Sequence, residues 1–306
     1  MNNFMSKMAK AVSFLILAAC VAIFALYLIQ KFGAEYAEEK IQQRITAAGL
    51  KAFIEYDSVH LDPFTLTPSL ENVRFGLKSA PWLNFARISF NSYLFKQPNL
   101  DVDFWIKDTP VDQLSRDTAA WFRQAGLEQV LGKGSFQSTL DGDILQSHLN
   151  LDIKDAGKLD LISHTQLATQ DLSLVDLRTD LLASVALGQP EAVLYLYGEQ
   201  LSIDQLSVTY QDTGLAQHLS GDWPQRLREW RIAKLEHLMD QLKLAPQGTS
   251  NALALARTLD QYLLNPTQVS LTFSPNEAMN LKQLALIAEQ KMLARQAKLK
   301  VTLLAN

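Results

Sequence analysis

The sequence predicts an α+β protein that has a single N-terminal transmembrane helix, an antiparallel β-sheet with packed helices, and a mostly helical C-terminal third. Residues 11–30 (AVSFLILAACVAIFALYLIQ) carry no charge, and about 20 apolar residues are enough for a helix to cross the ~30 Å hydrocarbon core of a bilayer. Apolar and polar residues then alternate in short runs, which is typical of strands. After residue 222 the spacing of apolar residues becomes helical.

This pattern divides the chain into five segments. They are a cytoplasmic tail (1–10), a transmembrane anchor (11–30), a stalk helix (31–49), a β-rich domain (50–221) and a mainly helical C-terminal region packed on the sheet (222–306). The N-terminus is expected inside, because a short basic tail before an apolar run resembles an export signal. The Lys and Arg counts on the two sides of the run are nearly equal, so the charge rule alone does not decide the orientation.

The single cysteine, Cys20, lies within the apolar run. One cysteine excludes a disulfide and a thiolate metal site in the rest of the chain. Residues 17–20 (LAAC) also match the lipobox of bacterial lipoproteins, in which Cys20 would be lipidated and become the new N-terminus. A retained span is favoured because the run stays apolar through residue 29.

Apolar residues at helical spacing, from Ala34 to Ala48, predict that the stalk helix packs onto the domain and ends at Gly49. Beyond it we expect strands separated by prolines in an antiparallel meander, and a helix over 111–131 that ends in the Gly132-Lys-Gly134 turn. A second group of strands follows, with a hairpin turn at Asp141-Gly142. The predicted strands are 52–60, 70–77, 85–93, 100–106, 135–140, 144–153, 158–167, 181–186, 192–197 and 205–210.

The last hundred residues contain three predicted helices, over 222–242, 250–264 and 277–296, the last with a capping box at residues 274–277. Strands are predicted at 269–273 and 298–304. The first of these helices places a row of large apolar side chains on one face, so it is a candidate for binding a partner protein. Its candidate contact residues are Leu227, Trp230, Leu235, Leu238 and Leu242.

No catalytic chemistry is indicated by the sequence. None of the five histidines has a partner at metal-ligand spacing, and no nucleophile elbow, phosphate-binding loop or dinucleotide motif occurs. The net charge of −4 argues against a nucleic-acid partner. We therefore expect a protein that is not an enzyme, with no catalytic residue, no metal and no cofactor.

The first third of the chain resembles the N-terminal part of AsmA-like proteins, a family of the Gram-negative cell envelope. The resemblance is carried by Gly49 and by residues 53–56 (FIEY), 59–64 (VHLDPF), 70–73 (LENV), 86–90 (ARISF) and 100–104. These are strand patterns with one Asp-Pro-Phe turn, and none of them is a catalytic motif.

The resemblance implies an inner-membrane anchored periplasmic protein whose curved sheet offers an apolar surface to phospholipid acyl chains. The implied role is non-catalytic, in envelope lipid handling or outer-membrane assembly. Candidate lipid-lining residues are Phe104, Trp105, Tyr195 and Tyr197. The alternative is a membrane-tethered protein–protein interaction module or adaptor that binds an envelope protein through the helical C-terminal region.

Overall fold

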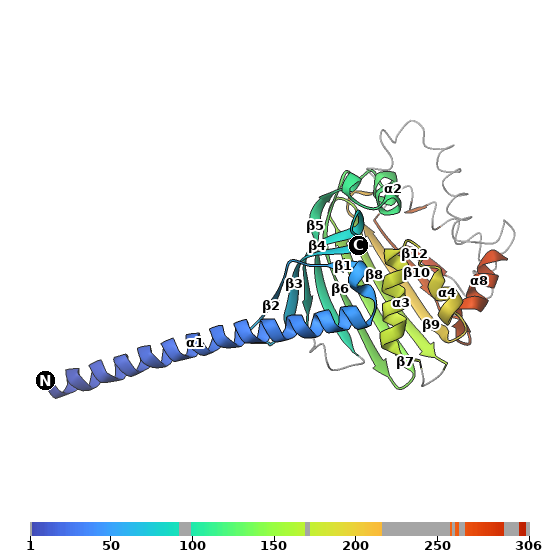
Figure 1. Cartoon of the computed structure of the whole chain (residues 1–306). Coiled ribbons are helices and arrows are strands. Elements are labelled where there is room, and N and C mark those ends of the chain that lie inside the picture. The colour runs from blue at the N-terminus through green and yellow to red at the C-terminus, as the bar shows by residue number, and fades with distance from the viewer. Residues whose placement is uncertain are drawn as a thin grey trace.

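The fold is seen in a computed structural model of the whole chain (Figure 1). It describes residues 2–91, 99–168, 172–215, 258, 261–262, 267–290 and 300–303. Within these ranges, the side chains of residues 2–23, 25, 124, 300, 301 and 303 lie outside the description.

A single antiparallel sheet dominates the described chain, and its strands follow one another as a meander in the order β1-β3-β4-β5-β6-β7-β8-β9-β10-β12. β2 pairs with β3, and β11 pairs with β9. The strands are β1 (Ile54–Glu55), β2 (Ser58–Leu61), β3 (Pro68–Leu77), β4 (Ala80–Phe90), β5 (Leu100–Pro110), β6 (Gln129–Asp141), β7 (Ile144–Ile153), β8 (Gly157–Leu167), β9 (Leu201–Asp212), β10 (Gln268–Phe273), β11 (Met279–Asn280) and β12 (Lys300–Leu303).

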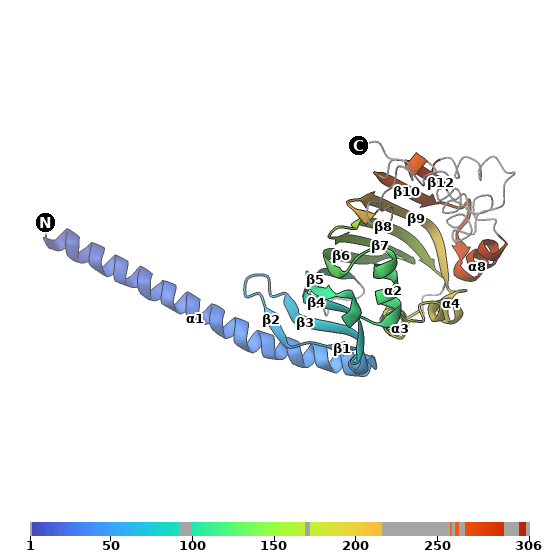
Figure 2. The ribbon, with the colours of Figure 1, turned by 90° about the horizontal axis from the view of Figure 1, so that it is seen from above.

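Helices α2, α3, α4 and α8 lie on one side of this sheet, whereas α1 projects away from it (Figure 2). The helices are α1 (Asn2–Ala47), α2 (Arg116–Gln124), α3 (Leu174–Ala186), α4 (Ala192–Tyr197) and α8 (Leu281–Glu289), with short 3-10 turns η1 (Leu50–Ala52) and η2 (Val111–Gln113).

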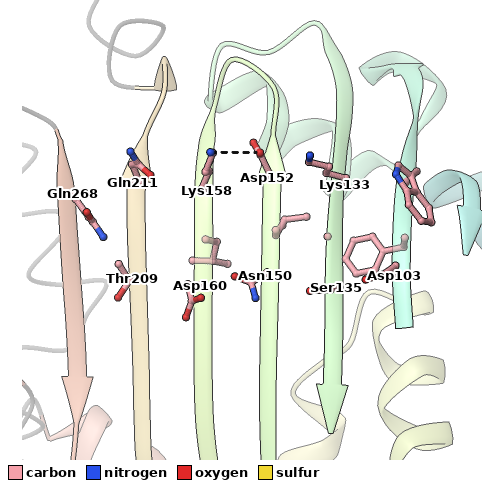
Figure 3. Close-up of a pocket in the computed structure, with 15 residues that line it drawn as sticks. Asp103, Lys133, Ser135, Asn150, Asp152, Lys158, Asp160, Thr209, Gln211 and Gln268 are labelled. Atoms are coloured by element: carbon pink, nitrogen blue, oxygen red, sulfur yellow. Dashed lines mark ion pairs between the residues drawn. The ribbon is translucent and has the colours of Figure 1, made fainter. Parts of the chain in front are cut away.

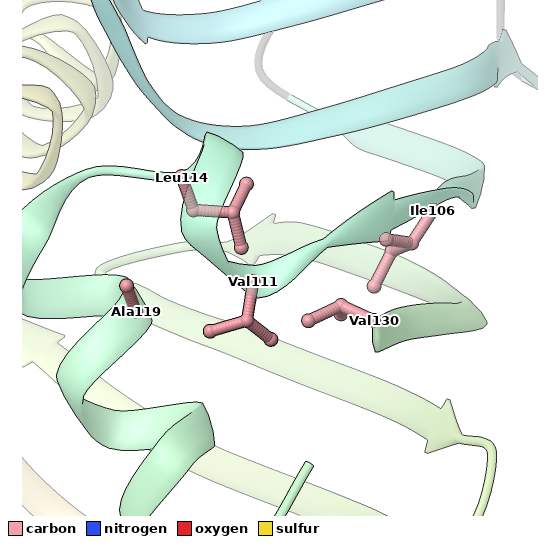
Figure 4. Close-up of a cluster of buried hydrophobic side chains, with 5 residues drawn as sticks. All are labelled: Ile106, Val111, Leu114, Ala119 and Val130. Atoms are coloured by element: carbon pink, nitrogen blue, oxygen red, sulfur yellow. The ribbon is translucent and has the colours of Figure 1, made fainter. Parts of the chain in front are cut away.

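Three apolar clusters hold the helices against the sheet. The C-terminal part of α1 buries Ile41 against Leu70 and Val73 of β3. η2, α2 and the adjoining ends of β5 and β6 enclose a second cluster, formed by Ile106, Val111, Leu114, Ala119 and Val130. Figure 4 shows Ile106, Val111 and Val130 of this cluster lying close together.

The third cluster joins α3 to the opposite ends of the central strands. Leu174 and Leu177 of α3 pack there with Leu167 of β8 and Leu201 of β9. The sheet is therefore covered at both ends of its central strands by helices on the same side.

The fold class predicted from the sequence is wrong, because antiparallel sheet dominates the described residues and few of them lie in helices. Residues 181–186 and 192–197, predicted as strands, belong to helices α3 and α4. Their apolar runs suit either structure. For α3, the Ser173 side chain favours the helix by capping the N–H of Asp176 at 3.3 Å, whereas α4 has no side-chain cap.

The predicted helix over 111–131 is also shorter in the structure, where η2 and α2 end before β6 begins at Gln129. Gly132 and Gly134, predicted as a turn, lie inside β6. A Cβ atom on Gly134 would collide with the Phe104 ring and with the carbonyl oxygen of Asn150. These glycines therefore permit close packing within the sheet and do not end a helix.

The predicted membrane anchor is corrected as well. In the part of the chain whose side chains are described, no helix has the length and apolar character that a membrane span requires. This finding contradicts the transmembrane helix over residues 11–30 and the single-pass inner-membrane localisation derived from it. The described part of α1 carries Lys31, Glu35, Glu38 and Lys40 and packs its apolar stripe on the sheet. Cys20, the residue of the lipoprotein alternative, has no described side chain.

The C-terminal third is not mostly helical in its described part, which contains β10, β11 and β12 beside α8. The predicted helices over 222–242 and 250–264 fall almost entirely outside the described residues. The helix predicted over 277–296 begins later, as α8, because residues 279–280 first pair with β9. Its N-terminus is closed by a capping box between Asn280 and Gln283, and not by residues 274–277.

Truncation of the buried core should measure how far stability depends on the η2–α2 cluster. Ile106 is 3 % exposed, so Ile106→Ala is expected to lower the free energy of unfolding by about 2–5 kcal/mol. Ile162→Ala is the matched control, because Ile162 is 38 % exposed on the other face of the sheet. Urea unfolding followed by circular dichroism measures both variants. Equal losses of stability would contradict the assignment of Ile106 to the core.

Candidate functional site

One row of apolar side chains crosses the sheet from β4 to β10. In register, each residue of this row stands opposite the next one on the neighbouring strand. We call it the central apolar row, and it comprises Phe90, Val102, Phe136, Leu149, Leu161, Val208 and Leu271. Every member is only partly buried, so the row is neither a sealed core nor a fully solvated surface.

The row runs between the two helical covers on this face of the sheet. Phe104 and Leu151, which lie two residues further along their strands, pack against the η2–α2 cluster. Leu140 and Leu145, toward the opposite ends of their strands, pack against the cluster that joins α3 to β8 and β9. Phe90, at one end of the row, packs against the α1 cluster, and all seven members of the row stay partly exposed.

Two polar contacts orient α3 at the edge of the central apolar row. Arg178 donates a hydrogen bond from Nη2 to Oγ of Ser138 at 3.1 Å, and Ser138 is only 1 % exposed. Burial lowers the pKa of the Arg178 guanidinium. This bond ties α3 directly to β6.

The second contact joins α3 to α4. The Tyr197 hydroxyl donates to Oδ2 of Asp180 at 2.5 Å. Burial, together with the Asp180 carboxylate, raises the pKa of the Tyr197 phenol to about 12. The phenol therefore stays protonated at neutral pH, and its hydrogen bond to Asp180 joins α4 to α3.

The four residues predicted to line a lipid site are separated by the structure. Phe104 lies on the apolar face and meets Phe85 edge-on, with ring centroids 5.7 Å apart. Trp105 points to the opposite face, where the Arg87 guanidinium lies 5.9 Å from its ring centroid. Tyr195 and Tyr197 are on α4 and not on a strand, and Tyr195 is 76 % exposed.

The residues predicted to bind a partner helix (Leu227, Trp230, Leu235, Leu238 and Leu242) all lie outside the described residues. The structure therefore does not test that interpretation.

The other face of the sheet is polar and carries an open groove of about 640 Å³. Figure 3 shows its side chains in two rows across neighbouring strands, with Lys158 paired to Asp152 at 3.9 Å. Nearby, His148 lies 3.0 Å from Asp160 and 3.0 Å from the Asn150 amide. The His148 and Asp160 side chains are 38 % and 42 % exposed, so this pair is hydrated and differs from a sealed catalytic dyad.

The described residues contain no group of three or more His, Cys, Asp or Glu side chains that could hold a metal ion. His164, which the sequence places on the strand beside His148, stands opposite Gln146 in the register.

Comparison of the sequence with models of known protein families found no match, and neither did comparison with curated proteins. The resemblance to AsmA-like proteins stays a prediction from the strand patterns.

The sequence did not predict the central apolar row as one surface, although the alternation of apolar and polar residues indicated some of its members. Alternation in residues 148–153 correctly places Leu149 and Leu151 on one face and His148 and Asn150 on the other. The same period-2 pattern recurs around Phe136, Leu161 and Val208. Knowing that they align requires the register of the strands, which the alternation alone does not provide.

The Tyr197–Asp180 hydrogen bond gives a pH-dependent prediction. An unperturbed tyrosine titrates near pH 10. A raised folded-state pKa contributes stability that is complete below about pH 10 and is lost as pH rises toward 12. Tyr197→Phe should therefore be less stable by about 1 kcal/mol at pH 8. The difference from the natural chain should shrink above about pH 10.

Urea unfolding at a series of pH values measures this difference. Tyr195→Phe, on the same helix and 76 % exposed, is the control and should match the natural chain throughout. A Tyr197→Phe deficit that persists unchanged to high pH would contradict this interpretation of the contact.

Proposed function

We propose that this protein is a non-catalytic lipid-handling protein that holds phospholipid acyl chains against the central apolar row. The observation that carries the proposal is the partial exposure of seven aligned apolar side chains on consecutive strands of one sheet. Large contiguous apolar surface that a fold leaves uncovered is commonly a binding site. The AsmA-like pattern of residues 49–104 points to the same role, in envelope lipid handling or outer-membrane assembly.

The dimensions of the row suit a long, flexible hydrocarbon. Seven neighbouring strands are separated by six spacings of ~4.8 Å, so the row extends over about 29 Å. Each buried methylene contributes about 0.8 kcal/mol, so ten methylenes contribute about 8 kcal/mol before the cost of ordering the chain. A contact along part of the row is therefore enough for measurable affinity.

The chemistry of the row favours holding over reaction. Its members are aliphatic or phenylalanine side chains, which supply neither a nucleophile nor an acid–base group. Arg178 and Ser138, which lie on the same face, are hydrogen-bonded to each other and join α3 to β6.

One pair of adjacent residues on β8 provides the test. Leu161 belongs to the central apolar row, whereas Ile162 points to the polar face. Leu161→Gln is expected to weaken binding of a fluorescent fatty acid, cis-parinaric acid, by about tenfold or more, because a buried amide without a partner costs about 1–3 kcal/mol. Ile162→Gln should bind as the natural chain does.

Fluorescence titration measures both affinities, and native mass spectrometry of the purified chain records any lipid that copurifies. Urea unfolding of each variant identifies a loss of binding that comes from unfolding. If folded Leu161→Gln binds the probe as well as Ile162→Gln, or the natural chain does not bind it, the proposal is wrong.

A further inference from the structure

A second exposed apolar surface lies outside the sheet face, where the β2–β3 connection meets α1. We call it the hairpin-tip patch. It combines Phe64 and Leu66 of the connection, 80 % and 48 % exposed, with four residues of α1. The α1 members are Phe24, Tyr27, Ile29 and Phe32, whose exposed fractions are 61, 56, 43 and 61 %.

Contacts between β2 and α1 place the two parts of the patch together. The Gln30 amide nitrogen lies 3.4 Å from the His60 ring, and Leu61 is buried against α1 at Gly33. The connection leaves β2 directly after Leu61. Figure 2 shows it beside α1, on the side toward the N-terminus.

The connection is a hydrogen-bonded turn, and its backbone already holds Phe64 in an exposed position. Oδ1 of Asp62 accepts the backbone N–H of Phe64 at 2.8 Å and of Thr65 at 3.3 Å, and these bonds lower the pKa of the Asp62 carboxyl. The Leu66 N–H bonds to the Asp62 carbonyl at 2.8 Å, and the Asp62 N–H bonds to the Thr67 carbonyl at 3.1 Å. Because the backbone N–H groups of Phe64, Thr65 and Leu66 are satisfied within the turn, the apolar side chains of Phe64 and Leu66 can insert while the charged Asp62 carboxylate stays at the polar headgroup level.

The distribution of the α1 residues indicates what covers the patch. At 100° per residue, Phe24, Tyr27, Ile29 and Phe32 spread over about 200° of the helix circumference. The rest of the circumference holds Gln30 and Gly33, which face β2. A partner helix would bury a single narrower stripe. Apolar side chains that face several directions, with exposed Lys31 among them, suit the mixed apolar and polar boundary of a lipid bilayer better than a single protein partner.

Lys31 and Glu35 are the first charged residues of α1 after Phe24, and both are exposed. Aromatic side chains such as Phe24 and Tyr27, followed by the long cationic side chain of Lys31, are typical of the boundary between lipid headgroups and acyl chains.

We propose that the hairpin-tip patch docks on the surface of a phospholipid bilayer, with Phe64 and Leu66 inserted at the boundary between headgroups and acyl chains. This contact is independent of the proposed acyl-chain site, since the patch and the central apolar row share no residue.

Because Cys20 is the only cysteine, a single environment-sensitive label can be placed at will in a Cys20→Ser background. We would attach the fluorophore NBD to Phe64→Cys in the full chain. The control is Leu77→Cys, at the other end of β3 and 47 % exposed. The probe is a vesicle of phosphatidylcholine and phosphatidylglycerol at three to one. Circular dichroism confirms that both labelled chains are folded.

The label at position 64 is expected to shift to shorter wavelength and brighten at least twofold with vesicles. A spin label attached to the lipid acyl chains should quench it. The label at position 77 should do neither. An unchanged label 64, or equal responses at both positions, would overturn the proposal. A shift of label 64 that requires no vesicles and grows with protein concentration would also overturn it, by assigning the patch to a second copy of the chain.

The same label separates this proposal from the proposed function. Leu161→Gln, combined with labelled Phe64→Cys, is expected to lose fatty-acid binding and to keep the vesicle response. Leu66→Ser is expected to lose the vesicle response and to keep fatty-acid binding. That result would locate the bilayer contact at the turn. Leu66→Ser with an unchanged vesicle response would contradict the insertion of Leu66.

Discussion

The structure depends on one constraint, which is the antiparallel register through the middle of the strands from β4 to β10. Side chains alternate between the two faces of a strand, so a slip of one residue would exchange the faces. Such a slip on β8 would replace Leu161 in the central apolar row by Asp160 or Ile162 and expose the apolar set to water. The hairpin turn at Asp141-Gly142 helps to fix this register, because its glycine adopts a φ of 63°.

Given that register, the helices decide how the apolar face is used. η2 and α2 cover one end of the strands and α3 and α4 cover the other, each through its own cluster. The partly buried central apolar row lies between these two covers, and the bonds of Arg178 and Tyr197 hold α3 and α4 beside it.

α1 connects the sheet with the hairpin-tip patch. Its C-terminal part buries Ile41 against β3, and the chain then reverses through Gly49, whose φ of 69° is readily adopted by glycine. β2 returns along α1 and brings the Asp62 turn beside Gln30. The patch and the sheet face are thus joined by the same strand, β3, which pairs with β2 on one side and with β4 on the other.

The sequence by itself determined the local features: the alternating strands, the Asp141-Gly142 hairpin, and the α1 stripe that includes Ala37 and Ile41. These depend on neighbours within a few residues, so periodicity is enough to reveal them. Only the tertiary structure decided that the apolar runs of α3 and α4 are helical, that Gly134 lies within a strand, and that Trp105 faces away from the apolar surface. It alone aligned seven side chains from residues 90 to 271, because register, curvature and helix cover depend on contacts between segments distant in sequence.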